Sequence, residues 1–375
     1  MSEPPRAEIH EGAAPARKGI PGAGPSLLRR RAPAILASIA IGLGFLWLLR
    51  AGALPVVPSA ESLARVPAWV PIAYAFVWLA VLLLRAVRWY WLLLPLHPVS
   101  MRRVLTASFI GYGALLLLPF RMGELVRPAL VREEGKLSGW AATGSAGAER
   151  VLDGLFLSAL LFVALLIARP LDPLPDRIGG LPVPAAVVPR AAYGMLAVFA
   201  AAFVAMGLFY FWRAAMRRLT ERVVGVVSPR LAGFLASRVE HIADGLRFLP
   251  SARYTGPFVA ITAVYWGVNA AGIWLVCRGA GVSGLTFAEA CVVMGVLALG
   301  VLVPNAPGFF GAFQISIYAG LAMYEPPSVV MQEGGAAVFW LYVIQIGITL
   351  LGAAVALLAR RVSPADALAI AEERP

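Results

Sequence analysis

Long apolar segments dominate the chain and predict a bundle of membrane-spanning helices. A helix needs about 20 mostly apolar residues to cross the hydrocarbon core of a bilayer. Six continuous segments approach or exceed that length with few charges, which favours spanning helices over soluble ones. These segments are 34–49, 70–94, 152–168, 192–212, 256–277 and 336–359.

Two further apolar regions are interrupted by proline. The region 104–131 is broken at Pro119 and then by charged residues, and the region 287–323 is broken by Pro304 and Pro307. Proline removes a backbone donor and clashes with the preceding helical turn, so each region should form two short helices joined at a break. The sequence predicts an all-α, polytopic membrane bundle of about eight transmembrane helices, including two broken or re-entrant helix hairpins.

Composition agrees with a membrane protein. Of 375 residues, 60% are hydrophobic and 14% are charged, and the mean hydropathy is +0.79. These values exceed what a soluble domain can bury. Residues 31–361 should form one transmembrane domain. The polar segments 1–30 and 362–375 are expected to be cytoplasmic tails, and the first of them has a composition typical of disorder.

The distribution of charge predicts the topology. The stretch 213–253 holds eight arginines against three acidic residues, so the positive-inside rule places it in the cytoplasm, together with the basic N-terminal tail. Both ends of the chain then lie on the cytoplasmic side of the inner membrane, provided that 104–131 returns to the face from which it enters. The second broken region enters from the opposite face, which is the outline of an inverted repeat. The same parity holds if each hairpin makes two full spans.

The net charge of +12 therefore reports topology and contact with anionic lipid headgroups rather than nucleic-acid binding. The two cysteines and three histidines have no metal-ligand spacing, so neither a metal nor a cofactor is expected.

Three charged residues follow the first break: Arg121, Glu124 and Arg127. Their i, i+3, i+6 spacing places them on one stripe of a helix, where neighbouring charges neutralise each other. Pro119 puts Arg121 in a first helical turn, where free N–H groups attract anions. The group predicts a phosphate-sized binding site. The alternative is a helix end at the membrane surface, with arginines that reach the headgroups.

A second charged group consists of Glu149, Arg150 and Asp153. These residues are expected to open the next span, where acidic side chains ordinarily complement the helix dipole. Alternatively, they neutralise Arg121 and Arg127 across the bundle.

The second break carries polar and small residues without charge. Pro307 suits a first helical position, glycines allow a ligand or another backbone to come close, and close helix packing is the alternative role. The candidate site residues here are Asn305, Pro307, Gly308, Gly311 and Gln314.

A last group lies within a long apolar run beside aromatic residues, as interfacial anchors at headgroup level commonly do. It consists of Arg85, Arg88 and Trp89.

Four of these strings resemble the flippase-like membrane family that includes the membrane region of lysylphosphatidylglycerol synthases. They are Arg-x-x-Arg-Trp at 85–89, Arg-x-Gly-Glu-x-x-Arg-Pro at 121–128, Glu-Arg-x-x-Asp-Gly at 149–154, and Pro-Gly-x-x-Gly with a polar residue three positions further on at 307–314. The resemblance extends over about 31–361. It implies an inner-membrane protein that moves a lipid between leaflets, with relatives associated with aminoacylated phosphatidylglycerol, hopanoids and polyprenyl-linked sugars.

The last string departs from the family pattern. Phe309 stands where the family has glycine, and Gln314 where it has glutamate. The departure removes support for a role that needs a carboxylate there, such as proton coupling. The soluble transferase domain of the synthases is also missing, so lysyl transfer is not expected.

The leading hypothesis is a lipid flippase or translocase, in which Arg121 and Arg127 bind an anionic or modified lipid while Glu124, Glu149 and Asp153 hold the arginines. No Gly-x-x-x-x-Gly-Lys-Ser/Thr string is present, so movement would be passive or coupled to an ion or the membrane potential. Two alternatives stay open. One is a nonenzymatic partner or regulator of an envelope lipid synthase, and the other is an intramembrane transferase acting on lipid headgroups, with Glu149 or Asp153 as general base.

Overall fold

The computed structural model describes residues 36, 40–51, 54–133, 135–178, 180–182, 187–212, 214–215, 218, 222, 243–302 and 306–360. The two predicted tails, most of the basic 213–253 stretch and Asn305 lie outside the described residues.

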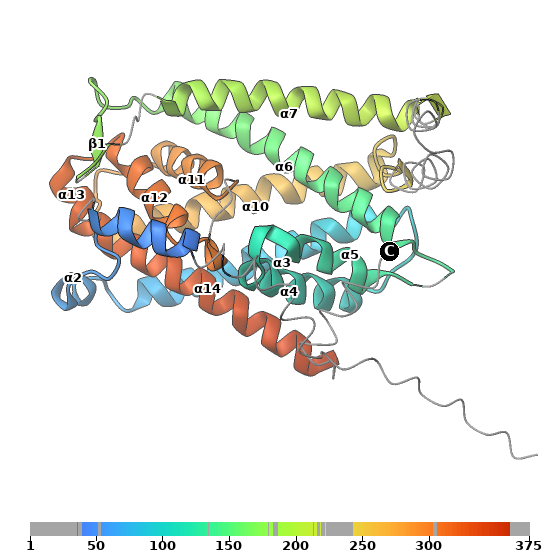
Figure 1. Cartoon of the computed structure of the whole chain (residues 1–375), viewed down its shortest axis with the longest axis horizontal. Coiled ribbons are helices and arrows are strands. Elements are labelled where there is room, and N and C mark those ends of the chain that lie inside the picture. The colour runs from blue at the N-terminus through green and yellow to red at the C-terminus, as the bar shows by residue number, and fades with distance from the viewer. Residues whose placement is uncertain are drawn as a thin grey trace, which may run out of the picture.

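Within the described residues, five long apolar helices run along the length of the molecule (Figure 1). Each is long and apolar enough to cross a membrane: α3 (Trp69–Leu93), α6 (Gly139–Ile167), α7 (Val187–Phe211), α10 (Ala252–Gly279) and α14 (Glu333–Arg360), the last preceded by α13 (Pro327–Met331). A shorter apolar helix, Ala40–Ala51, lies before them in the chain. The prediction of an all-α polytopic membrane bundle is confirmed.

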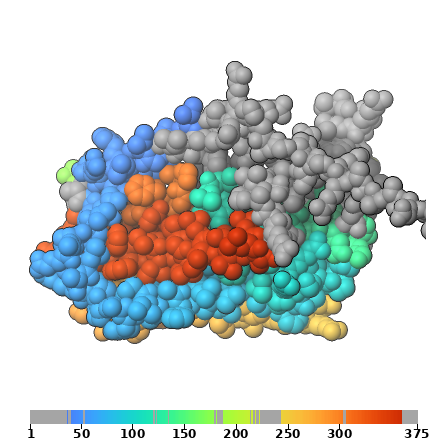
Figure 2. Space-filling model, turned by 90° about the horizontal axis from the view of Figure 1, so that it is seen from below, coloured from blue at the N-terminus to red at the C-terminus, as the bar shows by residue number. Residues whose placement is uncertain are grey.

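The remaining elements are small. Helix α2 (Ala60–Ala64) precedes α3, and a two-stranded antiparallel ribbon of β1 (Arg177–Ile178) and β2 (Leu181–Pro182) lies between α6 and α7. Figure 2 shows α14 running lengthwise along one face of the molecule, beside α3.

Helices α3 and α10 pack antiparallel to each other. Gly279, at the end of α10, contacts Val70 at the start of α3. Gly272, earlier in α10, contacts Tyr74, one turn later in α3. Small residues of this kind let two helix backbones approach closely in a membrane, where dispersion contacts drive association. The last residues of α3 and α10 therefore lie at opposite ends of the bundle.

The first broken region forms a hairpin that returns to the end from which it enters. It consists of α4 (Met101–Leu117), the 3-10 turn η1 (Pro119–Leu125) and α5 (Val126–Val131). Arg103, near the start of α4, donates to a carboxylate oxygen of Glu133 at 3.0 Å and to the carbonyl of Arg132 at 2.6 Å. Both ends of the hairpin are thereby joined.

The second broken region repeats this form. It consists of α11 (Phe287–Leu302), the 3-10 turn η2 (Pro307–Phe309) and α12 (Ala312–Ala322). Gly284, just before α11, lies against the carboxylate of Glu325, just after α12. Because each hairpin follows one of the antiparallel helices α3 and α10, the two hairpins enter from opposite ends, and Figure 1 shows them in opposite halves of the bundle.

Both predicted proline breaks are present, and they meet in the middle of the bundle. Pro119 and Pro307 each occupy the first turn of a 3-10 segment, and η2 packs against α4. Gly123 of η1 packs directly on the backbone of Leu115 in α4, where a Cβ atom would lie 2.1 Å from the Leu115 nitrogen. This close approach requires glycine and keeps the first hairpin tight.

Helix α6 differs from its predicted extent. It begins at Gly139, thirteen residues before the predicted start, and Ser138 caps it by accepting a hydrogen bond from the backbone N–H of Trp140. The added turns are rich in alanine, glycine and other small residues, which carry a weak hydropathy signal. Glu149, Arg150 and Asp153 therefore lie in the middle of a helix, and their predicted place in its first turn is wrong.

Candidate functional site

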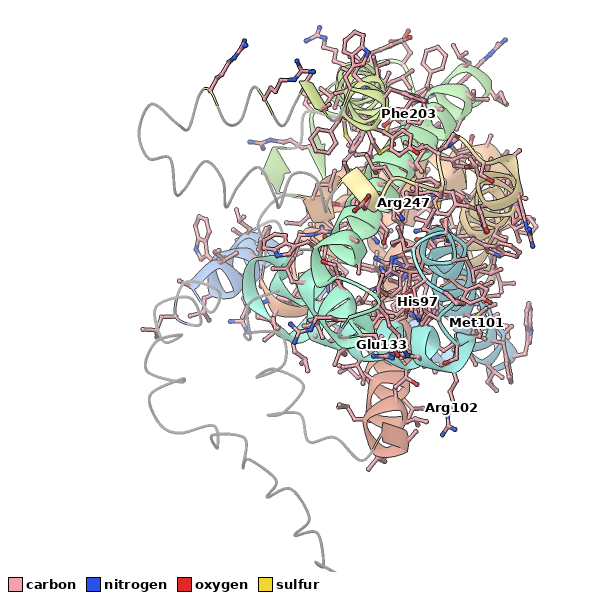
Figure 3. All side chains as sticks on the ribbon, turned by 90° about the vertical axis from the view of Figure 1, so that its right-hand side faces the viewer. His97, Met101, Arg102, Glu133, Phe203 and Arg247 are labelled. Atoms are coloured by element: carbon pink, nitrogen blue, oxygen red, sulfur yellow. The ribbon has the colours of Figure 1, made fainter. Side chains whose placement is uncertain are left out.

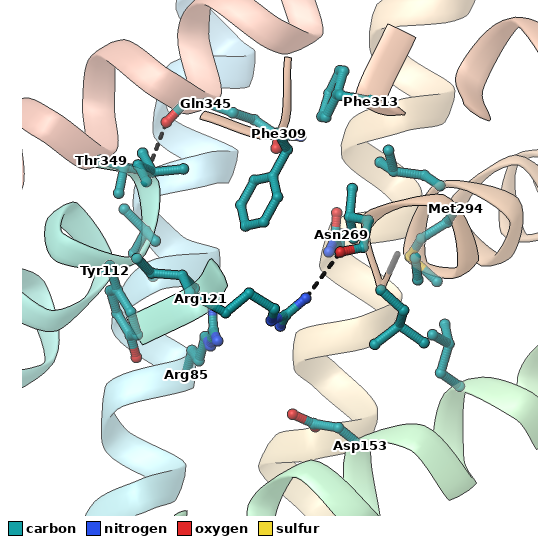
Figure 4. Close-up of a pocket in the computed structure, with 18 of the residues that line it drawn as sticks. Arg85, Tyr112, Arg121, Asp153, Asn269, Met294, Phe309, Phe313, Gln345 and Thr349 are labelled. Atoms are coloured by element: carbon teal, nitrogen blue, oxygen red, sulfur yellow. Dashed lines mark hydrogen bonds between the residues drawn. The ribbon is translucent and has the colours of Figure 1, made fainter. Parts of the chain in front are cut away.

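A cavity of about 430 Å³ lies in the middle of the bundle, where the two breaks meet. Helices α3, α4, α6, α7, α10, α11, α12 and α14 contribute to its walls together with η1 and η2, and Figure 4 shows part of this lining. Most of the wall is apolar. The charged residues that line it are Arg85, Arg121, Glu124, Arg150 and Asp153.

A smaller cavity of about 140 Å³ shares part of this wall. Arg85, Tyr112, Glu124 and Arg150 line both cavities, and the small cavity adds Arg127. Its other walls include small residues of α4 and α6, among them Gly111, Thr143, Ala146 and Gly147, together with Leu125 of η1 and Pro128 of α5. A group bound at the shared residues would therefore reach both spaces.

Arg121 connects the two broken hairpins. Its Nη2 lies 2.7 Å from Oε1 of Glu124, and its Nη1 donates to the carbonyl of Val301 in the last turn of α11 at 2.9 Å. The predicted pairing of Arg121 with Glu124 is confirmed. The Arg121 backbone has φ of +58°, a conformation uncommon outside glycine that is held here by surrounding contacts.

Arg127 does not share a stripe with Arg121 and Glu124. It lies on α5, 4% exposed, with Nη2 3.1 Å from Oε2 of Glu149 and its guanidinium 4.2 Å from the ring centre of Trp89. The predicted continuous i, i+3, i+6 stripe is wrong, because that spacing requires one α-helix and the chain instead passes from a 3-10 turn into α5.

Arg88 lies at the centre of a buried ion network. Its guanidinium donates to both carboxylate oxygens of Asp153 and to Oε1 of Glu149, the last at 2.8 Å. Aromatic rings cover it, with the Tyr265 ring centre 4.4 Å away. The network links α3, α5 and α6, since Glu149 also binds Arg127.

The expectation that Arg88 and Trp89 are interfacial anchors is wrong. Both are 0% exposed, and the Trp89 indole donates to the hydroxyl of Ser145 at 3.2 Å. The carboxylates of α6 compensate the charge of Arg88, so this side chain does not need to reach the headgroups. The sequence separation of about 60 residues hid this pairing.

Arg85 differs from the other arginines of the site. Its guanidinium lies 4.7 Å from the ring centre of Tyr112. Within the described part of the chain, no carboxylate lies within 4.0 Å of it and its Nε has no hydrogen-bond partner. It faces both cavities rather than an interface, and Figure 4 shows Arg85 and Arg121 pointing into the same space.

The second break contributes to the opposite wall. Gly308 and Phe309 line the large cavity, whereas Gln314 is buried and caps α12 by accepting a hydrogen bond from the Gly311 N–H at 2.7 Å. Gly311 packs against Phe45. Residues that the sequence did not single out, including Tyr112 and Asn269, also face the cavity (Figure 4). Among the described residues, no group of histidine, cysteine and acidic side chains is arranged to hold a metal.

A family model described as the lysylphosphatidylglycerol synthase TM region matches residues 35–352. The match includes both broken hairpins and all of the residues that line the two cavities. No curated protein and no solved structure matches the chain.

Proposed function

Since the chain belongs to the family of the lysylphosphatidylglycerol synthase transmembrane region, we propose that it moves a phospholipid between the two leaflets of the inner membrane. The central cavity is the proposed lipid site. The observation that carries the proposal is the set of arginines around this cavity, in the middle of a bundle whose helices are long enough to span a bilayer.

Charged side chains in the middle of a bundle of membrane-spanning helices are costly and therefore indicate a function. An arginine at the centre of a membrane helix costs about 2.5–3.5 kcal/mol on insertion scales, so such residues mark pairs or pathways. Arginine also matches phosphate geometry better than lysine, because its planar donors bind two oxygens at once. A lipid phosphate fits the chemistry of this cavity.

The predicted site residues have distinct parts in this proposal. Arg121 binds phosphate from the large cavity and Arg127 lines the small one, while Glu124 and Glu149 hold these two arginines. Asp153 acts through Arg88. The η2 break forms the opposing wall.

The two hairpins supply a route for alternating access. Broken helices that enter from opposite faces and meet at midplane are the arrangement of many transporters, in which one half rocks against the other around the site. Here the contact between Arg121 and the carbonyl of Val301 joins the two halves. A phosphate that binds Arg121 competes with this carbonyl and with Glu124.

A transferase fits the geometry less well. Glu149 is 0% exposed and is paired with Arg88 and Arg127, and Asp153 is held by Arg88. A general base needs an unoccupied oxygen near its substrate. These ion pairs oppose that role.

The test is reconstitution of the full chain into liposomes that contain a trace of fluorescent phosphatidylglycerol. An impermeant quencher added outside removes only outer-leaflet signal in protein-free vesicles, and we expect it to remove most of the signal when the protein is present. Arg121→Gln should slow this loss roughly tenfold or more, since a charge-assisted hydrogen bond is worth about 1.5–3 kcal/mol.

Arg102→Gln is the matched control. This arginine lies on α4, is exposed and points away from the bundle (Figure 3), so transfer should continue at the unmodified rate. Vesicles in which the full chain leaves the inner leaflet protected would refute lipid movement by the chain alone and favour a partner or regulator. A changed mass of the extracted lipid would favour the transferase.

A further inference from the structure

We infer that the site selects an anionic phospholipid, one whose headgroup has no ammonium group, over zwitterionic and cationic lipids. The inference rests on the proposed function and names the substrate class of the same site. Phosphatidylglycerol is the simplest lipid of this kind.

The charges around the two cavities do not balance. Among the described residues, four arginines line the cavities against two carboxylates, and these six are Arg85, Arg121, Arg127, Arg150, Glu124 and Asp153. Directly behind this wall, Arg88 and Glu149 add one charge of each sign. The site therefore carries an excess of two positive charges.

The ion pairs show where this excess lies. Each carboxylate has a close partner: Glu124 binds Arg121 at 2.7 Å, Glu149 binds Arg88 at 2.8 Å, and Asp153 binds Arg88 at 2.6 Å. Glu149 also neutralises Arg127 at 3.1 Å. The three acids therefore pair mainly with Arg121, Arg88 and Arg127. Neither Arg85 nor Arg150 is among these close partners.

Arg85 and Arg150 are the two arginines with weak compensation. The carboxylate oxygens nearest to Arg150 lie 3.5 and 3.7 Å away, on acids that bind Arg88 more closely. Arg85 faces Tyr112 and, in the described part of the chain, has no acid within 4.0 Å. Both side chains line both cavities, so a phosphate at their junction would contact the two of them.

The small cavity then receives the headgroup beyond the phosphate. It is roughly one third of the size of the large one, whose apolar walls suit acyl chains. Arg127, 4% exposed, lines the small cavity.

This environment favours hydroxyl oxygens and opposes an ammonium group. Hydroxyl oxygens of a glycerol headgroup accept hydrogen bonds from the arginines that line this cavity, whereas an ammonium group has no acceptor to offer them. An ammonium group would also add a positive charge beside Arg85, Arg127 and Arg150, in a region where low dielectric strengthens repulsion. The discrimination therefore comes from the headgroup, because all phospholipids share the phosphate.

Binding is tested separately from transport. The purified full chain in detergent is titrated with phosphatidylglycerol, phosphatidylcholine or lysyl-substituted phosphatidylglycerol of the same acyl chains, and bound lipid is counted by native mass spectrometry. We expect half-saturation with phosphatidylglycerol at a concentration roughly tenfold or more below that of the other two lipids. Equal binding of the three lipids, or tighter binding of either ammonium lipid, overturns the inference.

The assignment of Arg85 is tested by substitution. Arg85→Gln removes half of the excess charge and should reduce the preference for phosphatidylglycerol over phosphatidylcholine several-fold, whereas Arg85→Lys should keep most of it. Arg102→Gln, remote from both cavities, should keep all of it. A preference that Arg85→Gln leaves unchanged in folded protein overturns the assignment. The lipid series on the unmodified chain still tests the substrate class if the variant does not fold.

The two proposals fail in different ways. Selective binding of phosphatidylglycerol without transfer in liposomes supports this inference and refutes lipid movement by the chain alone. Transfer of phosphatidylcholine and phosphatidylglycerol at equal rates, with equal binding, supports the proposed function and overturns the selectivity.

Discussion

Arg88 on α3 and Glu149 on α6 form a buried ion pair in which both side chains are completely excluded from solvent, with Nη2 2.8 Å from Oε1. Glu149 uses its second oxygen for Arg127 on α5, and Arg88 also donates to both carboxylate oxygens of Asp153. One network thereby fixes α5 of the first hairpin to two long helices. Arg127, which faces the small cavity, is held from behind by this network.

Removing Arg88 should strongly destabilise the protein. Arg88→Gln leaves Glu149 with one partner fewer and leaves Asp153 with the more distant Arg150, 3.7 Å away. Loss of one member of a buried ion pair costs about 3–5 kcal/mol. The measurement is the thermal unfolding midpoint of the purified variant in detergent.

Arg65→Gln provides the matched control for Arg88→Gln. Arg65 pairs with Glu61 at 2.5 Å, but both side chains are more than half exposed, and exposed pairs contribute about 0–1 kcal/mol. Similar midpoints for the two variants would contradict a structural role of the buried network.

Gly311→Ala should destabilise the second hairpin. Gly311 has φ of +85°, and an added Cβ would lie 2.1 Å from the Cβ of Phe45. We expect a lower unfolding midpoint, because both the backbone conformation and the contact with Phe45 would be strained.

Gly267→Ala, in the middle of α10, is the control for this position. No atom lies within 4 Å of an added Cβ there, and alanine is better than glycine inside a helix by about 0.5–1 kcal/mol. A midpoint that rises for Gly267→Ala and falls for Gly311→Ala supports the requirement for glycine at position 311. Equal shifts would exclude this requirement.

The opposite entry of the two hairpins predicts which residues label from which side. Ser138, between the first hairpin and α6, and Ser328, in α13 after the second hairpin, are both exposed. In a background where the buried Cys277 and Cys291 are replaced by alanine, cysteines at these two positions should react with an impermeant maleimide from opposite faces of the membrane.

The charge distribution further predicts that position 138 is protected in intact cells and reacts after permeabilisation. Labelling of both positions from one face would contradict the inverted arrangement of the hairpins.

The clamp between the ends of the first hairpin should weaken in acid. Glu133, in the loop after α5, accepts a hydrogen bond from Lys136 at 2.9 Å and another from Arg103 at 3.0 Å. The hydrogen bond from Lys136, followed by the charges of Lys136 and Arg103, lowers the pKa of Glu133 below its ordinary value of 4.5. His97, which precedes α4, also lies near this carboxylate, with Nε2 3.8 Å from Oε2 of Glu133 (Figure 3).

The sign of the pH dependence follows from this lowered pKa. The stabilisation is complete above the unfolded-state pKa and is lost as the pH falls through the folded-state pKa. The difference in unfolding midpoint between the unmodified chain and Glu133→Gln should therefore shrink on acidification from neutral pH, and a constant difference would show that the clamp contributes through packing alone.

Hydropathy and proline positions were sufficient to predict the helices and the two breaks. Apolar runs determine which segments enter a membrane. These segments form helices, because each backbone polar group there must be satisfied within its own helix. The extent of α6 was underestimated, since its first turns are made of small residues that are helical because of how they pack. The pairing of Arg121 with Glu124 was also predictable, because the two residues are three positions apart.

The longer-range pairs of the site could not be predicted in this way. Charge types near the breaks indicated that a polar site exists, but nothing in the spacing of Arg88 and Asp153 along the chain indicates that they bind each other. Arg127 looked equally able to pair with Glu124, and Arg85 had the pattern of an interfacial anchor.

The sequence by itself determined a helical membrane protein with two interrupted hairpins and charges at one of them. Only the tertiary structure decided which charges neutralise one another and which face the cavities. The physical reason is that membrane insertion depends on local composition, whereas the compensation of a buried charge depends on which distant helix brings a carboxylate within hydrogen-bond distance. That packing leaves Arg85 and Arg150 available at the centre of the bundle.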